Sequence, residues 1–251
     1  MIQSTDTRQK VALVTGGGTG IGQAISQTLA KKGFKVVIVG RRLAVLQETA
    51  QDYPSIDAVV ANVVNSADLD QVIAHVQQKY GQLDVLINNA GIAPVTALED
   101  VSMAEYKNIF DLNVGAVIDL TIKALPLLKA SKGKIINIST GLVNNPMPHM
   151  SVYTASKAAV HSLTRSWAKE LAGDGIQVNV VAPGPTDTPL YDNDGLTAEE
   201  SKAHVDAVTQ IVPLARFGQA QEVANVVAFL SSDEASYITG ASYAADGGFG
   251  I

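Results

Sequence analysis

Residues 11–22 read Val11-Ala-Leu-Val-Thr-Gly-Gly-Gly-Thr-Gly-Ile-Gly22. The first five residues form a short apolar run typical of a buried strand, and the glycines after it open a helix. Glycine-rich backbone at a helix N-terminus approaches a pyrophosphate closely, and the helix dipole favours its negative charge. A strand-to-helix turn also favours glycine for structural reasons alone. Because this loop follows the first strand of a repeating strand–helix pattern, it predicts a nucleotide-binding site.

Similar β-branched runs recur along the chain at intervals of about 20 to 30 residues. The predicted strands are 11–15, 36–39, 58–61, 85–87, 135–138 and 178–181. Continuous apolar runs are typical of a parallel sheet covered on both faces. Ser102-x-x-Glu105 and Thr197-x-x-Glu200 read as capping boxes, and Asn65 or Ser66 caps a further helix. The pattern predicts one doubly wound α/β domain.

Composition narrows the possible function. The chain has 251 residues, 47% of them hydrophobic, a net charge of −6 and no cysteine. The negative charge gives no reason to expect nucleic acid or an anionic membrane as a partner. The absence of cysteine excludes disulfides and thiol-ligated metals, and the histidines show no metal-ligand spacing. Residues 1–10 are polar and no apolar run reaches the roughly 20 residues of a membrane span, so we expect a cytoplasmic protein.

The second predicted strand ends in Gly40-Arg41-Arg42. An acidic residue here would bind the adenosine ribose hydroxyls and repel a 2′-phosphate. Two guanidinium groups instead suit a phosphate, so the sequence favours NADP(H) over NAD(H), with Arg41 as the main contact. The alternative is that one of the two arginines only solvates the start of the next helix.

Tyr153 and Lys157 lie four residues apart near the start of a long helical run and therefore share one face. A phenol has an ordinary pKa of about 10. A cation about 4 Å away favours phenolate by roughly 4 kcal/mol at an effective dielectric near 20, which would bring the pKa close to 7 before burial opposes it. The pair is a candidate proton-transfer device, although this spacing is also common in ordinary helices.

Six motifs, taken together and in order, resemble the short-chain dehydrogenase/reductase family over essentially the whole chain. They are Thr15-Gly16-x3-Gly20-x-Gly22, Asn88-Asn89-Ala90-Gly91, Asn113, Tyr153-x3-Lys157, Pro183-Gly184 and Asp246-Gly247-Gly248. The resemblance implies a single Rossmann-type domain over residues 1–251, with a mostly seven-stranded parallel sheet, helices on both faces and a substrate lid at about residues 184–215.

The resemblance also implies catalytic roles. Tyr153 would be the general acid toward a ketone oxygen, and Lys157 would lower its pKa and bind the nicotinamide ribose. Asn113 would hold a water in a proton relay behind the lysine. The family's catalytic serine lies thirteen residues before the tyrosine, and Thr140 occupies that position here. We assign its role to Thr140, with Ser139 as the alternative.

The expected cofactor contacts combine the glycine loop, the arginines and the family positions. Asn62 replaces an acidic residue that is frequent in the family, and its amide can still pair with adenine. Asn89 would line the ribose or instead tie adjacent strands together. The full expected set is Gly16, Gly18, Thr19, Gly20, Ile21, Gly22, Arg41, Arg42, Asn62, Val63, Asn89, Ala90, Gly91, Tyr153, Lys157, Pro183, Gly184, Thr186 and Thr188.

The substrate pocket is expected between residues 142–150 and the loop after Pro183. Its predicted contacts are Thr140, Leu142, Met147, His149, Leu190 and Tyr191. These walls are mostly apolar and contain no lysine or arginine, which favours a neutral ketone or aldehyde, or the corresponding secondary alcohol. A lone histidine beside prolines, such as His149, is more typical of a wall or surface residue than of a second acid.

The sequence is compatible with three functions. The main hypothesis is an NADP-dependent carbonyl reductase or alcohol dehydrogenase with a small-molecule substrate. The first alternative is a 3-oxoacyl-[acyl-carrier-protein] reductase, which the sequence disfavours because Asp174 stands where similar reductases place a basic residue that attracts the acidic carrier. The second is a dinucleotide-binding redox sensor without turnover. The family resemblance further implies a homotetramer, with the helices at 103–123 and 151–171 at one interface and the C-terminal segment at another.

Overall fold

The computed structural model describes residues 8–189 and 205–251. Their main feature is a seven-stranded sheet in the order β3-β2-β1-β4-β5-β6-β9, in which every neighbouring pair is parallel. Its strands are β1 Val11–Thr15, β2 Lys35–Gly40, β3 Ile56–Val60, β4 Val85–Asn88, β5 Lys134–Ile138, β6 Gln177–Pro183 and β9 Ser242–Ala245. The predicted doubly wound parallel sheet is confirmed, and β9 is the strand that the sequence prediction missed. A separate two-stranded ladder joins β7 (Thr186–Asp187) to β8 (Gly218–Gln219).

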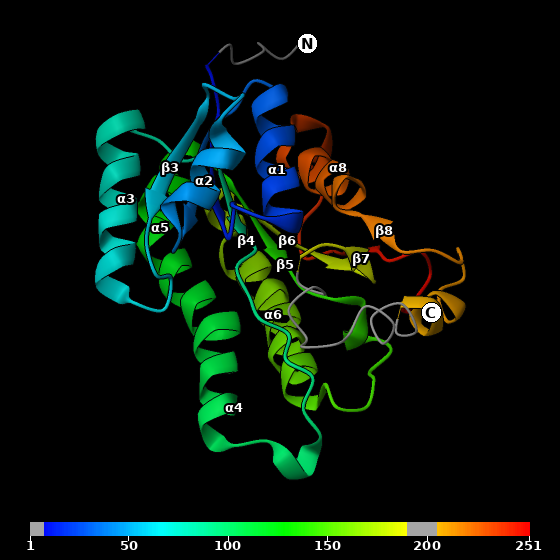
Figure 1. Ribbon diagram of the computed structural model, residues 1–251. Coiled ribbons are helices and arrows are strands. Elements are labelled where there is room, and N and C mark those ends of the chain that lie inside the picture. Colours follow the sequence, from blue (N-terminus) through cyan, green and yellow to red (C-terminus); the bar gives the residue numbers. More distant parts are fainter. Residues whose placement is uncertain (1–7, 190–204) are drawn as a thin grey trace.

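Helices cover both faces of the sheet (Figure 1). Helices α3 and α5 lie on one side, and α1 and α8 lie on the other. The described α-helices are α1 Gly20–Lys31, α2 Leu43–Ala50, α3 Ser66–Tyr80, α4 Met103–Phe110, α5 Ala116–Ser131, α6 Ser151–Glu170 and α8 Ala220–Ser231. A π-helical turn, η2 (Asp111–Gly115), joins α4 to α5.

Alternation along the strands divides the core into two apolar clusters. Val11 and Leu13 of β1 pack with α3, α5 and α6, while Ala12 and Val14 pack with α1 and α8. Because successive side chains of a strand point to opposite faces, a strand buried on both faces must be apolar at every position. The short apolar runs of the sequence are the direct result.

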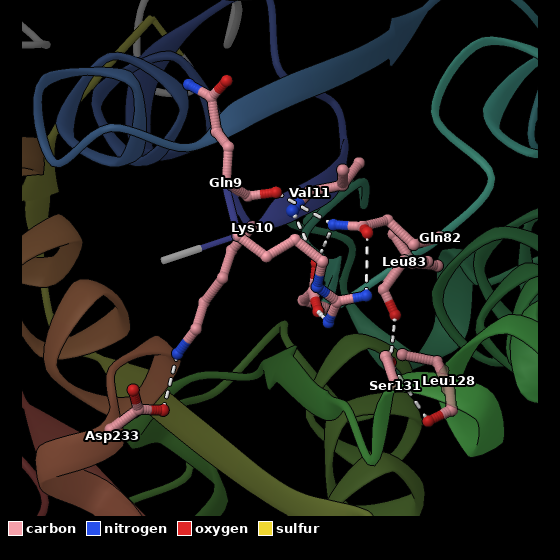
Figure 2. Close-up of polar contacts among 10 residues, drawn as sticks. Gln9, Lys10, Val11, Gln82, Leu83, Leu128, Ser131 and Asp233 are labelled. Atoms are coloured by element: carbon pink, nitrogen blue, oxygen red, sulfur yellow. Dashed lines mark hydrogen bonds and ion pairs between the residues drawn. The ribbon is translucent and has the colours of Figure 1, made fainter. Parts of the chain in front are cut away.

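The entry to β1 is fixed by a buried carboxylate at the amino edge of the sheet. Asp84 is buried and accepts hydrogen bonds from the backbone N–H of Val11 (2.7 Å), from Arg8 (2.9 Å) and from Gln82 (3.0 Å). Nearby, Lys10 forms an ion pair with Asp233 (2.5 Å) (Figure 2). The strands therefore start from a polar, well-connected edge, and the opposite edge is left for the site.

The predicted helix starts are found where the structure describes them. Ser102 caps α4 by accepting from the N–H of Glu105, but the Glu105 side chain accepts from Thr96, so the capping box is only half formed. Asn65, rather than Ser66, caps α3. Thr197-x-x-Glu200 and residues 190–204 of the expected lid lie outside the described residues. In the described ranges, no helix is long and apolar enough to cross a membrane.

The strand order reverses direction at β1, which pairs with β2 on one side and β4 on the other. Ligands of doubly wound sheets bind at such a switch point, outside the carboxyl ends of the strands. The loops that follow β1 and β4 meet there.

Candidate active site

A cavity of about 580 Å³ lies at this switch point. Most of the expected cofactor residues line it, namely Gly16, Gly18, Thr19, Gly20, Ile21, Gly22, Arg41, Arg42, Asn62, Val63, Asn89, Ala90, Gly91, Tyr153, Lys157 and Thr188. The expected residues Pro183, Gly184 and Thr186 do not line it. Gly184 instead packs against the backbone of Asp246, and Thr186 belongs to the β7–β8 ladder.

The glycine loop brings backbone close to the cavity. A Cβ atom at Gly22 would lie 2.1 Å from the carbonyl oxygen of Gly16, so the first turn of α1 packs directly on the end of β1. Gly16 and Gly20 have φ values of 65° and 54°, a conformation that disfavours residues with side chains. The first turn of α1 contains no acidic residue. Because Thr19 to Gly22 line the cavity, the N-terminal end of the helix dipole lies against it, and without a competing carboxylate it suits a pyrophosphate.

Asn89 joins the two loops of the switch point. Its amide donates to the carbonyl oxygen of Thr15 (2.9 Å), and its backbone N–H donates to the Thr15 hydroxyl (3.0 Å). Both of the roles considered from the sequence are thus compatible with its position, since it ties β4 to β1 and also lines the cavity.

The far end of the cavity carries the two arginines. Arg41 and Arg42 are both exposed and line the cavity, and Arg42 is the N-cap residue of α2. Across from them, the Asn62 side chain accepts from the N–H of Val64 (3.4 Å), and its backbone N–H donates to Asp68 (2.8 Å). The site thus offers cationic groups at its outer end and an amide beside them, which fits a phosphorylated adenosine.

Tyr153 and Lys157 project from the first turns of α6 into the inner end of the cavity. Lys157 is only 5% exposed, and its Nζ donates to the carbonyl oxygen of Ile138 (2.9 Å). Burial lowers the pKa of Lys157 from its ordinary value of 10.5 to about 8. The lysine is therefore still mostly protonated at neutral pH and presents a cation beside the tyrosine.

Asn113 lies in the π-helical turn and is fully buried. Its amide exchanges two hydrogen bonds with the backbone of Ile92 (2.9 and 3.0 Å) and donates to the hydroxyl of Ser156 (3.0 Å). A Cβ atom at Gly91 would lie 3.0 Å from the Asn113 oxygen and 3.3 Å from Lys157 Nζ. Asn113 thus connects the loop after β4 to α6 and lies next to the lysine. Its water-holding role stays a prediction.

Ser139 and Thr140 follow β5 and face the tyrosine helix. The Ser139 hydroxyl donates to the carbonyl oxygen of Lys157 (3.3 Å), so its proton is directed into α6. The Thr140 oxygen accepts from the N–H of Leu142 (3.3 Å), which leaves its own proton available for a substrate oxygen. Ser139 lines the cofactor cavity, whereas Thr140 does not. The hydrogen bonds decide which hydroxyl can donate, and they favour Thr140.

Thr140→Ala is expected to lower kcat about 100-fold, the cost typical of removing one hydrogen-bond donor from a developing oxyanion. Ser139→Ala should lower kcat less than about threefold, because its hydroxyl serves the helix backbone. Thr140→Ser is the matched control and should keep most of the activity. Steady-state kinetics of the three variants test the assignment, and a larger loss in Ser139→Ala than in Thr140→Ala would reverse it.

An apolar cluster adjoins the tyrosine on the side away from the glycine loop. Leu142, Tyr153, Val212 and Phe249 are its buried members, and Ala93, Met147 and Met150 pack against them. Leu142 and Met147 thus lie where the substrate wall was expected. His149 is exposed, with a left-handed backbone (φ 65°), and Leu190 and Tyr191 lie outside the described residues. Sequence reasoning missed Phe249, because only the fold brings the C-terminal segment to the site.

These positions define what the arrangement can do. A reduced nicotinamide in the cavity would supply a hydride to a carbonyl carbon. The Thr140 hydroxyl and the Tyr153 phenol would hydrogen-bond the carbonyl oxygen, Tyr153 would give it a proton, and Lys157 would keep the phenol acidic. The cavity volume, the close-packed glycine loop and the buried lysine all fit a nicotinamide dinucleotide. The class defined by fold and site is therefore that of Rossmann-type oxidoreductases that use such a cofactor.

Comparison with known proteins supports this class of enzyme. A family model described as enoyl-(acyl carrier protein) reductase matches residues 16–250. The chain is 39% identical to the 3-oxoacyl-[acyl-carrier-protein] reductase FabG of Thermotoga maritima, covering 96% of this chain and 98% of the relative. It is 40% identical to the 3-oxoacyl-[acyl-carrier-protein] reductase of Synechocystis sp., covering 95% and 96%. The chain belongs to the short-chain dehydrogenase/reductase family, and the predicted family and enzyme class are confirmed.

Solved structures show the same fold. A 3-ketoacyl-(acyl-carrier-protein) reductase from Brucella melitensis, complexed with NADH, superimposes with a TM-score of 0.90 at 33% identity, covering 96% of this chain and 98% of that one. The aldohexose dehydrogenase of Thermoplasma acidophilum superimposes with a TM-score of 0.87, also at 33% identity, covering 97% and 95%. The shared fold therefore accompanies different substrates.

Proposed function

We propose that this protein reduces the 3-oxo group of acyl thioesters carried on acyl carrier protein, with NADPH as the hydride donor. The observation that carries the proposal is the similarity, over nearly the whole chain, to several reductases named for this reaction. The apolar cluster beside Tyr153 is compatible with an acyl chain. This reverses the order of the two enzymatic hypotheses that the sequence alone favoured.

The sequence suggested that Asp174 would repel an acidic acyl carrier, but its position in the structure weakens this argument. Asp174 lies in the turn before β6, at the amino edge of the sheet, whereas the site lies at the carboxyl edge. Its carboxylate forms an ion pair with Lys129 (2.9 Å). Within one chain, this charge is both compensated and directed away from a carrier docked at the site.

A neutral ketone or secondary alcohol is the second candidate. It is favoured by the apolar walls around Tyr153 and by the lack of a lysine or arginine in residues 141–150. NADPH oxidation separates the two candidates when measured with 3-oxoacyl-carrier substrates, with their small thioester analogues and with simple ketones. Activity confined to the simple ketones would reject the main proposal.

The NADP preference is assigned to the arginines that follow β2. Arg41→Ala is expected to raise the Kd of NADPH about 10- to 100-fold, the cost of one charge-assisted contact to the 2′-phosphate. The Kd of NADH should change by less than about threefold, because NADH lacks that phosphate. Fluorescence titration of both cofactors measures the two effects.

Arg42→Ala is the matched control, since it removes the same charge one residue further along the chain. A stronger effect in Arg42→Ala would transfer the phosphate contact to Arg42. Equal losses for NADPH and NADH in both variants would contradict the phosphate role.

A homotetramer remains part of the proposal. Large apolar side chains on and before α4 are exposed, among them Leu98 and Met103, as expected of a helix that packs against another subunit. Sedimentation analysis of the purified protein tests this expectation.

A further inference from the structure

The C-terminal segment after β9 folds around one carboxylate. Asp246 accepts hydrogen bonds from the N–H of Gly248 (2.9 Å) on one oxygen and from that of Gly250 (3.0 Å) on the other. Gly247 and Gly248 have φ values of 63° and 88°, which allow the chain to turn this tightly. The segment 246–250 is thus a defined loop.

Two further contacts fix this loop against the site. The N–H of Leu214 donates to the carbonyl oxygen of Gly247 (3.0 Å), and the Asn145 amide donates to that of Phe249 (2.9 Å). Asn145 belongs to the segment that follows Thr140. The loop is therefore bound to the same segment that supplies the substrate-facing hydroxyl.

The side chain that this loop delivers is Phe249. Its ring is buried, with only 3% of the residue exposed, and it shares a cluster with Leu142 and Tyr153. A Cβ atom at Gly141 would lie 3.2 Å from the ring carbon Cδ1 of Phe249. Because Gly141 directly follows Thr140, the ring packs against the backbone next to the catalytic hydroxyl.

We infer that Phe249 is a specificity-determining residue, whose ring limits the length of the apolar substituent that the site accepts on one side of the carbonyl carbon. The inference rests on the proposed reduction of a carbonyl beside Tyr153. A phenyl ring offers no hydrogen bond and cannot select a polar group, so it acts by occupying volume. Its loop is held by these four hydrogen bonds as well as by packing, which makes the ring a stable wall.

The test compares binding of a short and a long ligand to the NADP⁺-bound enzyme, in which no reduction takes place. Calorimetry gives Kd values for 2-butanone and 2-octanone and for the N-acetylcysteamine thioesters of 3-oxobutanoate and 3-oxooctanoate. Phe249→Ala is expected to shift the long-to-short preference about tenfold toward the long ligand, the lower end of what one methylene contributes in an apolar pocket. Phe249→Leu should shift it in the same direction by less.

Phe34→Leu is the matched control, because Phe34 is a buried phenylalanine in the cluster on the other face of the sheet. It should leave the chain-length preference unchanged. An unchanged preference in Phe249→Leu and Phe249→Ala, with cofactor affinity retained, would overturn the inference, and Phe249→Leu decides alone if Phe249→Ala does not fold. Failure of the wild type to reduce any 3-oxoacyl thioester would reject the proposed function, while the ketone binding ratios would still decide the role of Phe249.

Discussion

Tyr153→Phe should lower kcat about 1,000-fold, within the range that a positioned general acid contributes. The substitution removes only the phenolic oxygen, so the ring keeps its place beside Leu142 and its packing is retained. The Kd of NADPH should change by less than about twofold, because the glycine loop and the arginines supply most of the cofactor contacts. Steady-state kinetics and a fluorescence titration measure the two quantities on the same preparation.

Tyr106→Phe serves as its control. Tyr106 is an exposed residue of α4 whose ring centroid lies 4.7 Å from that of Phe110, and it does not line the cofactor cavity, so the variant loses the same atom outside the site. Its turnover should equal that of the wild type. Near-normal turnover in Tyr153→Phe would refute the proton-donor assignment, and an equal fall in both variants would point to a general effect of the substitution.

Lys157→Met should have two opposite effects, since it removes a buried cation from the site. Turnover should fall at least 100-fold, because the tyrosine loses the charge that keeps it acidic. The free energy of unfolding at pH 7 should rise by about 2 kcal/mol. A pKa lowered from 10.5 to about 8 corresponds to a cost of about 3 kcal/mol, from which about 1 kcal/mol is subtracted for the lost bond to Ile138.

The stability difference between Lys157→Met and the wild type should depend on pH. Below pH 8 the lysine is protonated in both the folded and the unfolded chain, so the full cost of burying the charge is present. Between pH 8 and 10.5 the folded chain loses the proton first, so the stability of the wild type rises relative to that of Lys157→Met. Lys134, whose pKa burial also lowers to about 8, is common to both proteins and cancels in the difference.

Urea unfolding at pH 7 and pH 9.5 gives the two differences. Lys169→Met, on the exposed side of the last turn of α6, is the control and should stay within about 0.5 kcal/mol of the wild type at either pH. A Lys157→Met protein that is less stable than the wild type at pH 7 would show that the buried lysine stabilises the fold.

The sequence predicts the sheet because local residue patterns determine it. A strand such as Val36–Val39 must be apolar at every position to be covered on both faces, so the pattern alone indicates its class. The glycine loop is predictable for a similar reason, since Gly22 leaves no space for a Cβ atom above Gly16. Positions where the backbone geometry allows only one type of residue can therefore be recognised from the sequence.

The features that the sequence did not predict depend on contacts between distant segments. Residues 242–245 become a strand through pairing with β6, although Ser242 and Ala244 are exposed. Phe249 reaches the site because its carbonyl oxygen accepts from the Asn145 amide and that of Gly247 accepts from the N–H of Leu214, contacts that no local pattern encodes. The choice between Thr140 and Ser139 as the proposed hydrogen-bond donor is a similar case, because it depends on the bond from the Ser139 hydroxyl to the carbonyl oxygen of Lys157.

The position of Asn113 depends on the number of residues in the π-helical turn Asp111–Gly115. Each residue of a helix accounts for about 100° of rotation, and a π turn holds one residue more than an α turn. Loss of a single residue here would turn the wide π turn into an ordinary α turn, in which the remaining residues shift by up to one position, about 100°, around the helix axis. The Asn113 amide would then leave Ile92 and Ser156 even with its identity intact. A one-residue deletion in this turn should therefore impair the site, whereas a one-residue deletion at the end of an ordinary α-helix should be tolerated.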